Sequence, residues 1–282
     1  MDRKLFSGIL AVVVAVALLA GAGVSHAQGK GKGTLLMATT TSTDNTGLLE
    51  YLAPELKKDT GIELLWVAVG TGAALALGEN CDVSVLMVHD PDAEKEFMAK
   101  GYGTDRIQIM YNDFIIIGPK EDPANIKGKS VVESLKAIQK KKARFASRGD
   151  KSGTHMAELD LWKQAGIQTP DKESWYLSTG QGMINTINVA AEQNAYTLAD
   201  RGTFIKYEAN FKGNPPLVIL VEGEKELRNQ YSIIPVNPER CPNAKYDLAR
   251  EFAQWMTSER GQKLVADFKL MGKPLFYPNA GK

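Results

Sequence analysis

The feature of this sequence that most constrains its fold is a regular alternation of short apolar runs with amphipathic segments. Apolar runs at 34–40, 62–69 and 83–88 have the length and composition of buried strands. Each run is followed by a segment with helical periodicity, such as 47–58, where four leucines share one face. This alternation predicts an α/β fold with a mostly parallel sheet and helices on both of its faces.

A second alternating block follows a long apolar stretch at 106–118. The polar triplet 111–113 interrupts this stretch, and a strand broken at the triplet is expected to cross between the two blocks. The second block then repeats the plan of the first, with expected helices or strands at 130–142, 144–146, 152–165, 181–193 and 195–198. We therefore expect two lobes.

The chain is expected to return to the first lobe near its C-terminus. Two apolar runs, 217–221 and 231–236, bracket the polar turn 222–229 and supply a second crossing. The segment from Tyr246 carries apolar residues at helical spacing, so we expect it to dock on the first lobe. The expected lobes are 28–112 plus 224–282, and 113–223.

The first 27 residues have the composition of a secretory signal. Arg3 and Lys4 precede an apolar run at 5–24, and small residues surround the expected cleavage site near Ala27. The alternative is an uncleaved anchor, because the run is nearly long enough to span a bilayer. We expect cleavage, export and a protein free in solution.

Charge and cysteine content narrow the possible partners. The chain has 34 Lys and Arg against 33 Asp and Glu, and it lacks a large basic cluster. Nucleic acid is therefore not expected as a partner, because binding to phosphate backbones requires a concentrated basic face. An exported chain with only Cys81 and Cys241 has at most one internal disulfide, and the sequence leaves that bridge open.

Two turns of the first lobe carry candidate ligand-binding residues where an apolar run meets a helix. The first has consecutive hydroxyls, at Thr39, Thr40, Thr41 and Ser42, and the second is the Gly-rich turn at Thr71. Hydroxyls and first-turn amides at this edge of a sheet can bind an anion. The alternative interpretations are a helix cap for the hydroxyl run and a tight turn for the glycines.

The second lobe has a similar turn that contains a cation. Arg148 supplies a planar fork of donors, and hydroxyls and amides follow at Ser152, Gly153 and Thr154. Together they predict an anion site; the alternative is a capped helix with Arg148 paired to Asp150 at the surface. The turn at 178–182 has the same composition, and it adds two further candidates, Gln181 and Gly182.

Enzymatic chemistry is poorly supported by the same residues. Ser152 and His155 share one helix without the strained elbow that activates a serine, so a secreted serine hydrolase is a remote alternative. After signal cleavage only His89 and His155 remain, too few for a histidine-based metal site. We expect no catalytic residues, no cofactor and no cation site.

Seven segments in this order resemble the tungstate-binding periplasmic proteins of ABC importers: TTTST, GTGAAL, DVSVLMVHDPDAE, MYNDF, SRGDKSGTH, WY followed by TGQGM, and AYTLADRGTF. The resemblance covers nearly the whole mature chain. It implies a type II periplasmic-binding-protein fold with two crossing strands and the oxyanion in the cleft. It also implies that Arg148 is the main cationic contact and that Thr39 to Ser42, Thr71, Ser152 and Thr154 surround the ligand.

The resemblance also implies the partners. The ligand is expected to be tungstate or a related tetrahedral oxyanion, and the protein partner an ABC permease with a separate ATPase subunit. We expect a monomer in the periplasm, because both lobes must be presented to the permease. Molybdate, sulfate and phosphate are alternatives on the same scaffold, and residue chemistry alone does not separate tungstate from molybdate.

Overall fold

The structure is a computed structural model that describes residues 31–281. The predicted signal peptide, 1–27, lies outside the described residues. Among residues 31–281, no helix combines the length and the apolar character needed to cross a bilayer.

The first lobe begins with strands and helices in alternation, as predicted. Its elements in chain order are β1 (Gly33–Thr40), α1 (Thr41–Asp44), α2 (Leu48–Thr60), β2 (Ile62–Val69), α3 (Thr71–Glu79), β3 (Val85–Val88) and α4 (Pro91–Ala99). Strand β1 pairs in parallel with β2 on one side and with β3 on the other. The carboxyl ends of the three strands therefore meet at one edge of the sheet, where α1, α3 and α4 begin.

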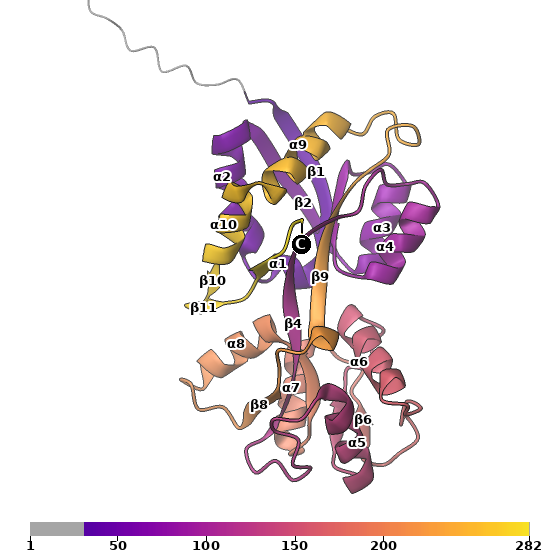
Figure 1. Ribbon diagram of the computed structural model, residues 1–282, viewed down its shortest axis with the longest axis vertical. Helices are drawn as coiled ribbons and strands as arrows, with labels where there is room; N and C mark the ends of the chain where they lie inside the picture. The colour runs from indigo at the N-terminus through magenta and orange to yellow at the C-terminus, as the bar shows by residue number, and fades with distance from the viewer. Residues whose placement is uncertain (1–30, 282) are drawn as a thin grey trace, which may run out of the picture. The chain divides into compact units, whose positions relative to one another are not determined.

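Two long strands connect the lobes. Strand β4 (Ile107–Pro119) and strand β9 (Arg228–Pro235) pair antiparallel, and Figure 1 shows them running side by side from one lobe into the other. The expected break at 111–113 was wrong, because β4 is continuous. Two of its polar side chains interact with other elements: Asn112 accepts a hydrogen bond from the amide of Asn229, and Asp113 forms an ion pair with Arg201. The second crossing starts at Arg228, inside the segment expected to be a turn.

The second lobe carries the other alternating block. Its elements in chain order are α5 (Val131–Lys141), β5 (Phe145–Ser147), α6 (Gly153–Gln164), β6 (Tyr176–Ser178), α7 (Met183–Glu192), β7 (Thr197–Asp200), α8 (Arg201–Asn210), β8 (Leu217–Val221) and the 3₁₀ turn η1 (Lys225–Leu227). Strands β5 and β6 pair in parallel, whereas β7 and β8 pair antiparallel with the far end of β4. Strand β6 and helix α8 were not predicted.

The sheet is mixed, which refines the expectation of mostly parallel sheets. In the described residues one sheet follows the order β12-β4-β9-β3-β1-β2, with β7 and β8 also pairing with β4. Parallel pairing joins β1 to its neighbours and β5 to β6, with one further parallel bridge between Phe145 of β5 and Tyr196. The crossing strands account for the difference. Strands β4 and β9 run in opposite directions between the lobes, and so they pair antiparallel.

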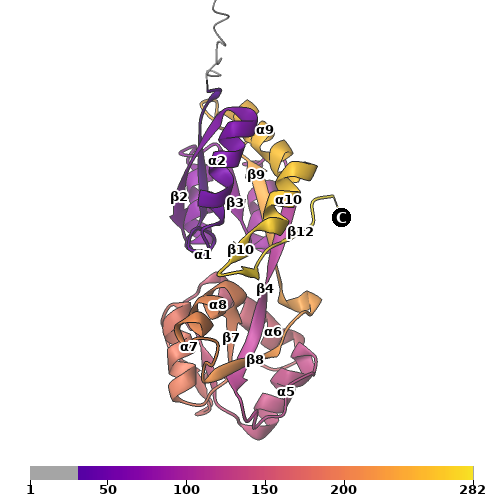
Figure 2. The same ribbon diagram turned by 90° about the vertical axis from the view of Figure 1, so that its left-hand side faces the viewer.

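The C-terminal segment returns to the first lobe, as predicted. Its elements are α9 (Tyr246–Thr257), α10 (Glu259–Asp267), β10 (Lys269–Leu270), β11 (Lys273–Pro274) and β12 (Tyr277–Pro278). The hairpin of β10 and β11 extends toward α8 of the second lobe in Figure 2, where Lys273 forms an ion pair with Glu208. The tail therefore contacts both lobes.

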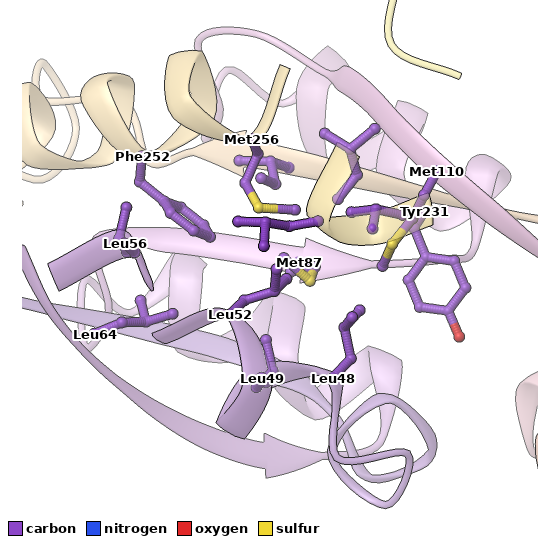
Figure 3. Packing of buried hydrophobic residues seen from close by; sticks show 14 of the residues in the cluster. Leu48, Leu49, Leu52, Leu56, Leu64, Met87, Met110, Tyr231, Phe252 and Met256 are labelled. Carbon is purple, nitrogen blue, oxygen red and sulfur yellow. The ribbon is translucent and has the colours of Figure 1, made fainter. Parts of the chain in front are cut away.

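Each lobe has its own hydrophobic core. Figure 3 shows that of the first lobe, where Leu52 of α2 and Met87 of β3 lie among Phe252 and Met256 of α9. The second lobe packs its aromatic residues around Trp162, which is fully buried. Apolar burial of this kind is the main favourable term in folding, so each lobe is a rigid support for its side of the cleft.

The two cysteines are bonded to each other. Cys81 follows α3 and Cys241 follows β9, with their Cα atoms 5.3 Å apart. The sequence left this bridge open, because the distance between the Cα atoms decides whether it forms and the sequence does not give that distance. The bridge ties two loops within the first lobe.

Candidate functional site

The first wall of the site is the hydroxyl-rich turn between β1 and α1. Thr40 is the N-cap of α1, and its Oγ1 accepts a hydrogen bond from the backbone N–H of Thr43 at 3.3 Å. Thr41 and Ser42 follow in the first turn and are exposed toward the cleft. Thr39 differs from them, because it is fully buried and its hydroxyl donates to the carbonyl of Met87 at 2.8 Å.

The turn between β2 and α3 belongs to the same wall. Helix α3 begins at Thr71, and the residue before it, Gly70, gives it no side-chain cap. The amides of the first turn therefore remain available to a ligand. Both residues line the cleft beside Ser42.

The opposite wall is the turn between β5 and α6 in the second lobe. Ser152 caps α6, since its Oγ accepts from the backbone N–H of His155 at 3.3 Å. The turn requires glycine at position 149. Its φ is +61°, and the Cβ of any other residue there would collide with the side chain of Ser178. This conformation brings Arg148 and Thr154 to the cleft, where Nη1 of Arg148 lies 3.5 Å from Oγ1 of Thr154.

Arg148 also forms the ion pair that the sequence offered as the alternative. Its Nη2 donates to Oδ2 of Asp150 at 2.5 Å, and Oδ1 of Asp150 accepts from the backbone N–H and the hydroxyl of Ser152. Burial raises the pKa of Asp150, but the hydrogen bonds from Ser152 and Arg148 outweigh it and hold this pKa below its ordinary value. Asp150 fixes the guanidinium through this ion pair, and within residues 31–281 the buried Nε of Arg148 has no hydrogen-bond partner.

These two walls enclose a cleft of about 290 Å³. Its predicted lining residues are Thr40, Thr41, Ser42, Thr71, Arg148, Ser152, Gly153 and Thr154. A wider hollow of about 530 Å³ shares Thr41, Ser42 and Arg148 and adds Gly182. Gln181 lines neither, and its backbone N–H donates to Thr179 at 3.3 Å.

The sequence interpretation missed His89 and Asp200, which also line the cleft. His89 follows β3, at the same sheet edge as the hydroxyl turn, so its place after an apolar strand was a usable signal. Asp200 is the N-cap of the unpredicted helix α8 and accepts from the backbone N–H and the hydroxyl of Thr203, each at 2.8 Å.

The cleft offers many donors and few free acceptors. Asp90 and Asp200 line it, but each already accepts from the first turn of a helix. Ser152 donates to Asp150 rather than to an imidazole, and Nδ1 of His155 accepts from the backbone N–H of Lys151. This arrangement can bind an anion that has no proton to donate, since such an anion needs donors alone.

Comparison with known proteins places these features in a family. Residues 22–260 match the family model described as a PBP superfamily domain. The tungstate-binding protein TupA of Campylobacter jejuni is 54% identical over 239 residues, which cover 85% of this chain and 88% of that protein.

Two solved structures extend the comparison. The tungstate-binding protein TupA from Desulfovibrio alaskensis G20 has a TM-score of 0.86 at 63% identity, covering 88% of this chain and 99% of that one. The tungstate ABC transporter structure from Geobacter sulfurreducens has a TM-score of 0.73 at 47% identity, covering 83% and 98%. The chain belongs to the PBP superfamily and, within it, to the family of the tungstate-binding protein TupA.

Proposed function

We propose that this chain is a periplasmic solute-binding protein that captures tungstate in its cleft for an ABC importer and catalyses no reaction. The observation that carries the proposal is the meeting of Arg148 with the hydroxyls of Thr41 and Ser42 around one cleft. The names of the relatives support tungstate as the ligand and a transporter as the partner.

The proposed ligand contacts come from both walls. We assign them to Thr39 through Ser42 and Thr71 in the first lobe, and to Arg148, Ser152, Gly153 and Thr154 in the second, with weaker roles for Gln181 and Gly182. Within this set, Thr39 and Ser152 act by anchoring their turns, because their hydroxyls already donate to the carbonyl of Met87 and to Asp150. Gln181 acts indirectly, since it does not line the cleft.

The strength of the proposed site comes from charge-assisted hydrogen bonds. Each such bond contributes about 1.5 to 3 kcal/mol. Six or seven of them could supply about −12 kcal/mol, which is nanomolar affinity, after the costs of ordering. A dianion without protons suits this set, whereas a protonated phosphate would need a free acceptor.

Binding is proposed to close the lobes, taken as 28–112 plus 224–282 and 113–223, about the crossing strands. A ligand that contacts both walls favours the closed arrangement because it binds that arrangement more tightly. A closed monomer would then dock on the permease, while a separate subunit hydrolyses ATP.

Calorimetric titration with tungstate, molybdate, sulfate and phosphate tests the proposal. We expect the tightest binding for tungstate and weak or absent binding for phosphate. Thermal unfolding with the same anions provides a second reading, because a ligand of the folded state raises the melting temperature. Absence of binding by all four anions would contradict the proposal.

A further inference from the structure

A chain of hydrogen bonds runs from the hydroxyl turn to both crossing strands through His89. Nε2 of His89 lies 2.9 Å from Oγ1 of Thr40 and 3.2 Å from Oγ of Ser42. Nδ1 of the same ring lies 3.0 Å from Oδ1 of Asn229 on β9. The ring also packs on Tyr231, with the ring centroids 4.7 Å apart.

The partners of His89 determine which of its nitrogens carries the proton. The side-chain amide of Asn229 donates to Oδ1 of Asn112 on β4 at 2.8 Å, so the carbonyl oxygen of Asn229 faces the ring. A carbonyl oxygen only accepts, so Nδ1 of His89 must donate. Burial lowers the pKa of His89 below its ordinary value, and the neutral ring then has a lone pair on Nε2.

That lone pair accepts one hydroxyl proton from the turn. Thr40 is the nearer donor and is only 3% exposed, whereas Ser42 is exposed to the cleft. Oγ1 of Thr40 accepts from the backbone N–H of Thr43 and also lies 2.7 Å from Oγ1 of Thr43 and 3.1 Å from Oγ of Ser42. With the Thr43 hydroxyl as the donor in the shorter of these two pairs, the proton of Thr40 points at the ring. The proton of Ser42 then remains available for a ligand.

We propose that His89 is a positioning residue of the oxyanion site. Its Nδ1–H tautomer, held by Asn229, accepts the hydroxyl proton of Thr40 and so leaves the Ser42 hydroxyl to donate to the anion. This inference rests on the proposed function and assigns a role to a residue outside the predicted set. It also connects the hydroxyl turn to both crossing strands, through Asn229 and Asn112.

Two partial replacements separate this role from a purely structural one. His89→Gln places an amide oxygen near the position of Nε2 and retains an acceptor for Thr40. His89→Asn places its amide near Nδ1 and loses that acceptor. Both remove part of a buried network, so both should lower the melting temperature.

Tungstate titration of the two variants gives the decisive reading. We expect the affinity of His89→Gln to lie within about threefold of that of the original protein, because the acceptor for Thr40 is kept. We expect His89→Asn to bind about tenfold more weakly, because that acceptor is lost. Gln139→Asn, which alters an exposed residue of α5 outside the cleft lining, is the control and should bind normally. Equal affinity of the two His89 variants, or the reverse order, would overturn the inference.

Nitrogen NMR of the histidine rings tests the tautomer without any ligand. Comparison with the His89→Gln spectrum assigns the His89 signals among the three histidines of the chain. We expect a neutral ring with its proton on Nδ1, and a proton on Nε2 would overturn the inference. If the original protein binds no oxyanion, the proposed function fails, yet the spectrum still decides the tautomer.

Discussion

The two walls of the cleft differ in charge and in what supports them. The wall of the first lobe offers neutral donors from Thr41, Ser42 and Thr71, and a neutral histidine lies behind the hydroxyl turn. The wall of the second lobe offers Arg148, held by Asp150. The comparison indicates that the wall of the second lobe, with Arg148, supplies most of the electrostatic attraction for an anion. The wall of the first lobe supplies neutral donors that orient the anion.

Behind these walls the two lobes are stabilised by different means. The first lobe carries the disulfide between Cys81 and Cys241. The second buries Glu158 of α6 without a cation, and its Oε1 accepts from the indole of Trp162 at 3.1 Å and the hydroxyl of Tyr176 at 2.6 Å. The buried carboxyl of the first lobe, Glu94, is instead paired with Arg106 at 2.6 Å. The following predictions use this contrast, in order of expected effect.

Replacing both Cys81 and Cys241 by alanine should lower the free energy of unfolding by about 2 to 5 kcal/mol. The bridge closes a long loop, because its residues are 160 positions apart, and its loss frees the unfolded chain. Neither residue lines the cleft, so tungstate affinity should change little. Chemical denaturation measures the free energy of unfolding, and calorimetry measures the tungstate affinity. A large loss of affinity would show that the geometry of the first-lobe wall depends on the disulfide.

Glu158 should make the second lobe less stable as pH rises from about 4.5 to about 7. Burial raises the pKa of Glu158 to about 7, against 4.5 for the ordinary group, so in this window the folded chain keeps a proton that the unfolded chain has released. The contribution of protonated Glu158 to the free energy of unfolding is fully present below pH 4.5. It is lost as pH rises through 7, by about 3 kcal/mol in total.

Glu158→Gln should reduce this pH dependence without abolishing it, because the amide does not titrate whereas burial also raises the pKa of Glu94 in the first lobe. Denaturation curves at several pH values measure the slope for both proteins. Glu133→Gln is a suitable control, since Glu133 is an exposed carboxylate of the capping box on α5. An unchanged slope in Glu158→Gln would place the titration elsewhere.

Arg148→Ala should weaken tungstate binding by at least about tenfold, because a partly buried charge-assisted contact is lost. The fold should remain, although Asp150 loses its partner. Arg144→Ala is the matched control: Arg144 lies in the same lobe and bonds to the carbonyl of Gln193, outside the cleft. Calorimetric titration compares the variants, and unchanged affinity in Arg148→Ala would remove the charge contrast between the walls.

Local sequence pattern located most of the cleft residues at the correct turns but misplaced Thr39. Turns rich in hydroxyls and glycine follow apolar strands, so local pattern placed Thr41, Ser42, Thr71 and Arg148 correctly at the sheet edges, and the cleft brings them together. The pattern placed Thr39 in the same group because adjacent strand residues look alike in sequence. In the structure Thr39 still lies within β1, where its hydroxyl donates to the carbonyl of Met87 on β3, whereas Thr40 is already the N-cap of α1.

The features that the sequence did not predict depend on distant partners. Strand β4 continues through Asn112 because Asn229, 117 positions away, satisfies its amide. His89 joins the site through the same asparagine, 140 positions from the histidine. No local pattern carries such pairings, since they arise only when the chain returns through β9.

Thr71→Val should give the smallest effect, a loss of about fivefold in tungstate affinity. The substitution removes one hydroxyl with little change in volume. Its bond to the anion contributes about 1 kcal/mol, less than a buried charge-assisted bond, because Thr71 is partly exposed and water can take its place. The amides at the start of α3 remain, so most of what this turn offers an anion is preserved. Thr169→Val, outside the cleft, is the control for a threonine-to-valine change in the same titration. A loss as large as that of Arg148→Ala would mean that the neutral wall contributes as much attraction as the charged one, and the contrast between the walls would then be one of geometry rather than of charge.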